Sequence, residues 1–424
     1  MVQLILLAAV LISLLIRLFF ISQSKHIADI YLMYTMGAVF LEGKNPYLVL
    51  DFNAYPPLAI FLEAASMQIS SNLQTSFVSV LKFWPNLADF ITAFVIYKVL
   101  VKTKIKPVSA ALWSGFFLLN PISIIISSAH GQLDSIPSLF VLLSISILML
   151  KSKKIFFYLS AILLGIAITI KPNPAMLIPL FLFYKRINLK QRIIYLILIF
   201  IPIIVTLFPF LGQDPNEVLV RVLSYSGVND ISFAAILRGI WYQNNAVTNL
   251  PLTFHFLSVS KFIFASAAIT LILLFAGWKN LAKSCLAIYL MFLTSYFGIG
   301  SQYLVWLIPL ATLARDKMVF YYTIFGLLAL VGFYLFFGPD ILLGKLTSLE
   351  PFQPKNIYLY FYGNLVFWIF SLSWLINIIY QFYEAHFFSL GILRRKLIYF
   401  TFLLFILSLV PQGYLIKELF NSLP

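Results

Sequence analysis

The chain has 424 residues, of which 62% are hydrophobic, 17% aromatic and 10% charged, and its mean hydropathy is +0.98. Soluble domains are about 45–50% apolar and about 25% charged, so the composition excludes a soluble enzyme, a disordered tail and a nucleic-acid-binding module. The single cysteine, Cys285, excludes an intrachain disulfide and a cysteine-rich metal cluster. A net charge of +15 indicates a polyanionic partner in a soluble protein, but the placement of the charges gives another explanation.

Apolar blocks long enough to cross a membrane recur along the chain. A helix needs about 20 apolar residues to cross a hydrocarbon core of about 30 Å. The first block lacks a preceding basic stretch and a clear cleavage site, so we expect a retained helix rather than a signal peptide. No soluble domain interrupts the blocks, and residues 1–424 are predicted to form one integral-membrane domain. The sequence predicts an all-α polytopic bundle of about 13 transmembrane helices, near residues 2–22, 77–101, 108–128, 133–150, 155–170, 173–184, 193–211, 258–277, 285–297, 303–313, 318–337, 358–382 and 397–416.

The connections between these blocks alternate in charge. Every second one is basic, and only Asp316 and Glu384 oppose the cations there. Because basic loops stay in the cytoplasm, the N-terminus is predicted to be cytoplasmic, in the plasma or inner membrane. The net charge then follows from this bias and requires no nucleic acid. The basic residues are Lys102, Lys104, Lys106, Lys151, Lys153, Lys154, Lys185, Arg186, Lys190, Arg192, Lys279, Lys283, Arg315, Lys317, Arg394, Arg395 and Lys396.

The opposite, outer side carries the longer and more varied segments, 23–76, 212–257 and 338–357. In the first of these, Asp29 directly follows the first span and precedes two amphipathic stretches. The stretches, Ile30–Leu41 and Leu58–Ile69, predict two helices lying in the membrane interface. The prolines at Pro56 and Pro57 stop helix propagation, so a turn region from Gly43 to Pro57 joins the two helices. Asp29 is either a solvated N-cap or a functional acid.

A second outer motif runs from His130 through Gln132 and Asp134 to Ser135, at the outer end of the third predicted span and the start of the fourth. Ionisable groups near membrane depth are rare and usually functional. The alternative is that Asp134 or Ser135 only caps the following helix.

Three further outer features carry polar side chains. Lys171 precedes Pro172 and either snorkels or binds a phosphate. The long loop carries Arg221, Arg238 and His255, which suit a phosphate or anionic headgroups. Near the tenth span, Gln302, Tyr303 and Trp306 suit substrate binding, although the aromatic pair also fits interfacial anchoring.

At these residues the chain resembles the GT-C superfamily of integral-membrane glycosyltransferases, especially polyprenol-phosphate-sugar-dependent members and mannosyltransferases of lipid-linked and GPI-anchor assembly. In one respect it departs from the family, because Asp29 is followed by Ile30 and Tyr31, whereas many members carry paired acids there. We therefore expect no metal site and no cofactor, and a divalent cation stays an alternative. The matching pieces are Asp29, Gly43 to Tyr47, Tyr55 to Pro57, His130 to Ser135, Ile170 to Pro172 and Ser301 to Trp306.

The resemblance implies an inverting transfer of a hexose or pentose, with mannose favoured, from a polyprenyl-phosphate donor on the outer face. The acceptor is a hydroxyl of a lipid-linked or glycan molecule, and it needs a general base. Asp29 is the first choice for this base and Asp134 the second. Gln132, Gln302 and Tyr303 are expected to orient sugar hydroxyls or the phosphate. Cations should stabilise the departing phosphate, and the candidates in falling order are Lys171, Arg238, Arg221, His130 and His255.

Two other functions stay open. One is a transporter or flippase of lipid-linked saccharides, but transporters usually carry polar groups near the bilayer midplane, and here the mid-span acids reduce to Asp89. The other is a polymerase or ligase of lipid-linked saccharides, which shares the membrane and the face.

Overall fold

The computed structural model describes residues 1–23, 28–50, 55–150, 153–184, 188–223, 230–243, 250–275, 278, 280–346, 349–386, 391–392, 395–396 and 398–403. Every regular element within these ranges is an α-, 3₁₀- or π-helix, and they contain no strand. The prediction of an all-α protein is therefore confirmed for the described part of the chain.

The helices follow the predicted apolar blocks, and each block up to 358–382 coincides with one or more of them. The block at 397–416 lies almost wholly outside the described residues. The elements are α1 (Val2–Gln23), α2 (Ala28–Leu41), α3 (Pro46–Val49), α4 (Pro57–Asn72), α5 (Phe77–Lys102), α6 (Pro107–Leu118), α7 (Pro121–Ile124), η1 (Ile125–His130), α8 (Ser135–Leu150), α9 (Lys154–Ile170), η2 (Asn173–Leu177), α10 (Ile178–Tyr184), α11 (Leu189–Leu207), η3 (Phe208–Phe210), α12 (Pro215–Leu223), α13 (Phe233–Gln243), α14 (Leu250–Phe275), α15 (Leu281–Ser295), η4 (Ser301–Trp306), α16 (Leu307–Ala314), α17 (Met318–Phe337), α18 (Pro339–Leu343), η5 (Gly344–Leu346) and α19 (Pro354–His386).

Within the described residues, five helices are long and apolar enough to cross a membrane, and a bent pair makes a sixth. The pair joins Pro107–Leu118 to Pro121–His130 at an angle of 40°. The remaining apolar helices are shorter. The chain is thus a multi-pass membrane protein, and the count of about 13 spans stays a prediction. The five long segments are Val2–Gln23, Phe77–Lys102, Leu189–Phe210, Met318–Phe337 and Pro354–Glu384.

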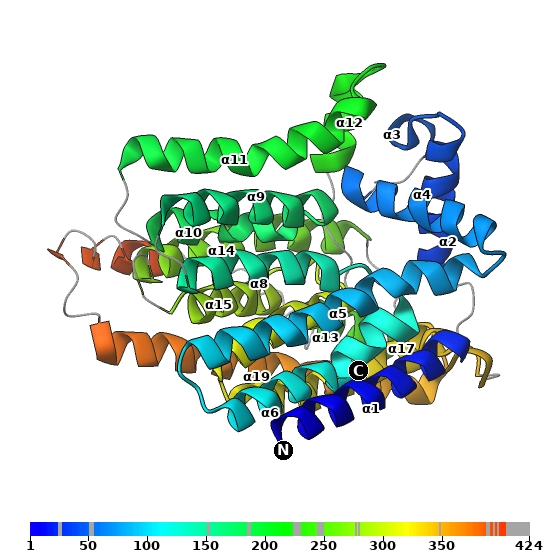
Figure 1. Cartoon of the computed structure of the whole chain (residues 1–424). Helices are drawn as coiled ribbons and strands as arrows, with labels where there is room; N and C mark the ends of the chain where they lie inside the picture. Colours follow the sequence, from blue (N-terminus) through cyan, green and yellow to red (C-terminus); the bar gives the residue numbers. More distant parts are fainter. Residues whose placement is uncertain are drawn as a thin grey trace.

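The long helices lie side by side and form the body of the molecule (Figure 1). α6, α5, α8, α9 and α11 pack in that order, each against the next, while α1 packs on α6 and α17 packs on α19. The short helices α2, α3, α4 and α12 gather at one end of this body (Figure 1). α1 leads into this end and α5 leaves it, so it is the end that the charge pattern assigns to the outer side.

α2 and α4 occupy the positions of the two helices that the sequence predicted for the membrane interface. α2 ends at Leu41, and Gly43 adopts a φ of 74° in the turn that follows. α4 begins at Pro57, where the missing N–H of proline costs no hydrogen bond. α2 and α4 approach closely at Gly37, since a Cβ there would lie 3.0 Å from the backbone of Glu63 and Ala64.

The orientation of α5 gives a direct test of the predicted topology. Thr75 and Thr103 flank this helix and are both exposed. Replacing each by cysteine should let a membrane-impermeant maleimide label Thr75→Cys in intact cells and Thr103→Cys only after permeabilisation. The native Cys285 is fully buried and should stay unlabelled. Labelling of both sites from the same side would contradict both the crossing of α5 and the shared outer face.

Candidate functional site

A π-helical turn presents the second outer motif to the rest of the molecule. Asn120 caps α7 by accepting a hydrogen bond from the backbone N–H of Ile122, at 3.0 Å. The helix continues as η1, which Gly131 ends in the left-handed region with a φ of 89°. The span predicted at 108–128 is a bent pair of helices, because the segment breaks before Pro121 and bends there by 40°. π-helical turns are rare and occur often at functional sites.

The last residue of this turn meets the early outer-loop acid. Asp29 Oδ2 lies 3.0 Å from His130 Nε2 and accepts a hydrogen bond from Gln132 Nε2 at 2.7 Å. On its other side, His130 Nδ1 lies 2.8 Å from the hydroxyl of Tyr334 on α17. The His130 side chain is 4% exposed, whereas that of Asp29 is 42% exposed. We call these four residues the Asp29 centre: a partly exposed carboxylate that is held by buried groups.

The surroundings keep Asp29 ionised. Burial is the largest single influence and raises the pKa of this carboxyl. The hydrogen bond and charge of His130, the charge of Lys171 and the hydrogen bond of Gln132 together outweigh burial, so the pKa lies below its usual value. A carboxylate with a lowered pKa keeps its basic form at neutral pH and loses it only as the pH falls through that pKa.

A buried ion pair lies beside the Asp29 centre. Lys171 Nζ donates to Asp134 Oδ2 at 2.7 Å, and the two side chains are 5% and 0% exposed. Trp306 Nε1 donates to the other oxygen of Asp134 at 2.9 Å. Lys171 Nζ also lies 5.4 Å and 5.5 Å from the ring centres of Tyr55 and Tyr303, within the range of cation–π attraction. Lys171 therefore lies inside the protein and does not snorkel to solvent.

Tyr303 and Trp306 also lie inside the protein. They are 1% and 3% exposed, and their rings stack with centres 4.4 Å apart. The alternative of interfacial aromatic anchoring is therefore wrong for both residues. Gln302 is buried as well, and its Oε1 lies 3.4 Å from the hydroxyl of Ser301.

The long outer loop contributes a second cation near the same place. Arg238 Nη1 lies 3.5 Å from Asp230 Oδ1, and its guanidinium lies 4.4 Å from the ring centre of Phe337. The pKa of Asp230 is raised to about 6. Burial is the largest cause, the charge of Arg238 opposes it and the charge of Asp29 adds to it. The charges of Asp29 and His130 both act on Asp230, so Asp230 lies near the Asp29 centre. Above a pH of about 6, the Arg238–Asp230 pair is charged on both sides.

Two predicted residues are not brought into these groups by the described contacts. Arg221 donates to Glu217 Oε1 at 2.6 Å and to the Leu50 carbonyl at 2.8 Å, between α12 and the segment after α3. His255 belongs to α14, but its side chain lies outside the described part of the structure.

Sequence reasoning missed the two residues that complete the first contacts, Tyr334 and Asp230. Tyr334 lies in an apolar span of a chain with 23 tyrosines, so nothing in the local sequence distinguishes it. Asp230 follows Asn229 in the long loop, and its polarity was the only available signal. Tyr334 acquires its role through its contact with His130 of η1, and Asp230 through its contact with Arg238.

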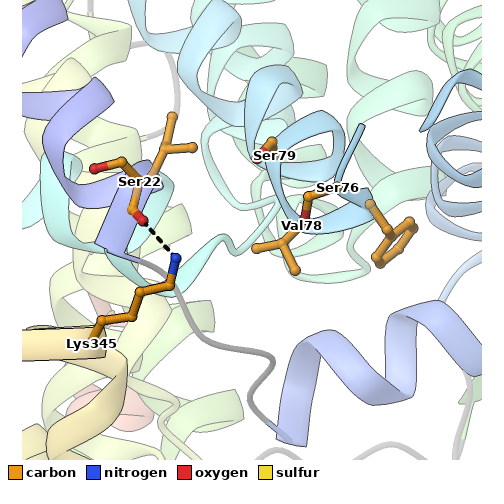
Figure 2. Close-up of a pocket in the computed structure, with 7 residues that line it drawn as sticks. Ser22, Ser76, Val78, Ser79 and Lys345 are labelled. Atoms are coloured by element: carbon orange, nitrogen blue, oxygen red, sulfur yellow. Dashed lines mark hydrogen bonds between the residues drawn. The ribbon is translucent and has the colours of Figure 1, made fainter. Parts of the chain in front are cut away.

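A pocket of about 400 Å³ lies beside the end of α1 and the start of α5 (Figure 2). Lys345 donates a hydrogen bond to the Ser22 carbonyl across it, at 3.3 Å. None of the predicted site residues lines this pocket, so it does not contribute to the argument for catalysis. Its lining consists of Ile21, Ser22, Ser76, Phe77, Val78, Ser79 and Lys345.

The comparisons with known proteins find one partial similarity. No family model matches the chain. Over 156 residues the chain is 31% identical to GPI mannosyltransferase 1 of Candida albicans, a match that covers 36% of this chain and 37% of that protein. The matched part therefore spans little more than a third of the relative's length.

Proposed function

We propose that the chain is a membrane glycosyltransferase that moves a sugar, with mannose favoured, from a polyprenyl-phosphate donor to an acceptor hydroxyl. The observation that carries this proposal is the Asp29 centre, where buried His130 and Gln132 hold a half-exposed carboxylate. The partial identity to GPI mannosyltransferase 1 supports the class of reaction. The outer face of the plasma or inner membrane is the proposed location, and a lipid-linked or glycan molecule is the proposed acceptor.

Asp29 would act as the general base. Both of its hydrogen bonds to described side chains fall on Oδ2, so Oδ1 is the oxygen proposed to take the proton of the acceptor hydroxyl. As that proton leaves, the acceptor oxygen bonds to the anomeric carbon, and the bond from this carbon to the phosphate oxygen breaks. One displacement of this kind inverts the anomeric centre. The phosphate departs as an anion, so no protein acid has to protonate it.

Lys171 and Arg238 are the cations proposed to stabilise the departing phosphate. Each is held by a carboxylate, Asp134 for Lys171 and Asp230 for Arg238. Such pairing fixes a cation in place before substrate arrives, which favours electrostatic stabilisation without reorganisation. His130, Gln302, Tyr303, Arg221 and His255 remain further candidates for substrate binding.

The transporter alternative is weakened by the contacts of the mid-span acid. Asp89 Oδ2 lies 2.7 Å from Arg17 Nη1, and both side chains are 1% exposed. Ser123 and Ser127 also donate hydrogen bonds to Asp89 Oδ2, so the described contacts of this acid join helices to one another. The polymerase or ligase alternative shares the same chemistry and has to be separated by the acceptor.

Transfer by the purified protein tests the proposal. Reconstituted in nanodiscs with a synthetic polyprenyl-phosphate mannose and a short mannoside acceptor, the protein should form a glycoside of inverted configuration, detected by mass spectrometry and NMR. Donors carrying other hexoses or pentoses define the sugar, and a parallel reaction with EDTA tests the divalent cation. Movement of the donor across a liposome bilayer without transfer would support a flippase instead. Transfer of a preassembled oligosaccharide, but not of a single sugar, would support a polymerase or ligase.

A further inference from the structure

Three polar residues form a stripe on α5. Lys82, Asn86 and Asp89 are spaced by four and three residues and therefore share one face of the helix. Arg17 of α1 joins them, since its Nη1 donates to Asp89 Oδ2 at 2.7 Å and to Asn86 Oδ1 at 2.8 Å. All four are nine-tenths buried or more. We call this set the polar ladder.

Side chains of the polar ladder form several hydrogen bonds with α7 and η1, the segment that ends in His130. Asp89 Oδ2 accepts from Ser123 Oγ at 2.8 Å and from Ser127 Oγ at 2.7 Å. The next hydroxyl, Ser128 Oγ, donates to Asn86 Oδ1 at 2.6 Å.

Two further bonds hold the backbone of the same turn. Asn86 Nδ2 donates to the Ser127 carbonyl at 3.2 Å, and Lys82 Nζ donates to the Ala129 carbonyl. These bonds reach the residue immediately before His130.

This arrangement matters because η1 is a π-helical turn. In an α-helix each residue turns the chain by about 100°, so a change of one residue in register would rotate His130 away from Asp29. Gly131 confirms how closely the segment is fitted, since a Cβ there would lie 2.7 Å from Cε of Lys82. The bonds to the polar ladder hold η1 in the register that brings His130 Nε2 to Asp29.

We propose that the polar ladder positions His130 for the reaction, so that Arg17, Asn86 and Asp89 are positioning residues for the Asp29 base. This inference rests on the proposed function for its effect on catalysis. Its structural part, that the ladder holds the His130–Asp29 contact, does not depend on which reaction the protein performs.

The test removes two bonds of the ladder without changing its charge. Asp89→Asn leaves Arg17 buried without its partner and risks misfolding, so the double variant S127A/S128A is the better probe. If His130 loses its contact, the pKa of Asp29 rises, because the hydrogen bond and charge of His130 contribute to lowering it. The acid limb of the kcat/KM profile should then move up by about one pH unit. We also expect kcat to fall about 10- to 100-fold, with the donor KM nearly unchanged.

S127A also removes the 2.9 Å contact between the hydroxyls of Ser127 and Ser135, but the charged and polar side chains nearest to the His130–Asp29 contact are unchanged in S127A/S128A. They face His130 and Asp29 from α5, from the turn after η1, from the ends of α9 and α17 and from the segment before α13. These groups are Lys82, Gln132, Asp134, Lys171, Asp230 and Tyr334.

A matched control cuts a buried hydrogen bond elsewhere. Tyr195 and Ser160 join α11 to α9 through a 3.1 Å contact between their hydroxyls, and both residues are fully buried. Tyr195→Phe should lower the stability without moving the acid limb. His130→Asn should reproduce the shift of S127A/S128A, and combining the variants should add little further shift.

A second readout is independent of sugar transfer. The chain has four histidines, so the imidazole signal of His130 in a histidine-labelled sample is identified by its loss in His130→Asn. The chemical shift of this signal at a fixed pH should change in S127A/S128A, where the contact with Asp29 is lost, and stay constant in Tyr195→Phe. If the wild-type protein transfers no sugar, the proposed function fails, while this measurement still decides the positioning role. An unchanged His130 chemical shift and an unchanged acid limb in a folded S127A/S128A variant would overturn it.

Discussion

Asp29→Asn should abolish sugar transfer while the protein stays folded and membrane-inserted. Removing a general base typically lowers the rate by about 10²–10⁴-fold. An asparagine Oδ1 can still accept the hydrogen bond that Gln132 donates to the carboxylate, so the geometry of the Asp29 centre should persist. The carboxamide cannot take the proton of the acceptor hydroxyl. Single-turnover transfer with saturating donor measures the loss, and a thermal melt in detergent measures the stability.

Asp134→Asn is the matched control, because it changes the other candidate base in the same way. Asp134 is fully buried between Lys171 and Trp306, so its replacement should chiefly affect stability and the placement of Lys171. Transfer at a near-normal rate by Asp29→Asn, together with an inactive Asp134→Asn, would show that the base is Asp134. The half-exposed position of Asp29 is the reason to expect the opposite.

Loss of Asp29 has to be separated from loss of a helix cap. Asp29 lies in the first turn of α2, where a negative charge interacts favourably with the helix dipole by about 0.3–1 kcal/mol. Such a loss shifts the melting temperature slightly and leaves the chemistry intact. A rate loss of several powers of ten at nearly unchanged stability therefore identifies a base.

The sequence predicts which residues belong to the candidate site better than it predicts which of their side chains contact one another. The position of Asp29 after the first span and of His130 after the third predicts that both lie on the outer side, because the basic loops between spans alternate. Sidedness brings these residues to one face, but it carries no information about which side chains touch. The His130–Asp29 contact joins positions 101 residues apart, and it depends on how α2 and η1 pack against the long helices.

Hydropathy also gives no indication of the π-helical turn that directs His130 towards Asp29. The block at 108–128 is predominantly apolar and carries no charge, so it predicts one span. The break at Asn120 and Pro121 was visible as a cap followed by a proline at the first helical position. The π-helical register of η1, by contrast, depends on Asn86 and Asp89 of α5. An interaction with another helix cannot be recognised from the periodicity of the segment itself.

The mid-span charges show the same limit. Arg17 and Asp89 each interrupt an apolar block, and in isolation each suggests a substrate pathway. In the structure they neutralise each other at 2.7 Å and bind serines of α7 and η1. Polarity within a span therefore indicates that a partner exists, and only the fold shows whether that partner is a substrate or another helix.

Lys171→Ala should destabilise the protein and also impair use of the donor. Lys171 and Asp134 are 5% and 0% exposed, and removing one partner of a buried ion pair costs about 3–5 kcal/mol. Asp134 would remain buried, with Trp306 as its hydrogen-bond donor. A lowered melting temperature is therefore expected whether or not Lys171 binds the phosphate, so the single variant does not separate these roles.

The double variant Lys171→Met with Asp134→Asn separates them. It removes both charges, while asparagine still accepts the hydrogen bond from Trp306 Nε1. Replacing both members of a buried ion pair by neutral groups is often close to neutral for stability, so the melting temperature should return towards that of the wild type. If Lys171 stabilises the departing phosphate, kcat/KM for the donor should remain about 10- to 100-fold low, the size of a lost charge-assisted hydrogen bond. Lys171→Arg should retain part of the activity, because it keeps the charge. Normal transfer by the stable double variant would show that Lys171 serves only the ion pair, and Arg238 would then be the cation to test for the phosphate.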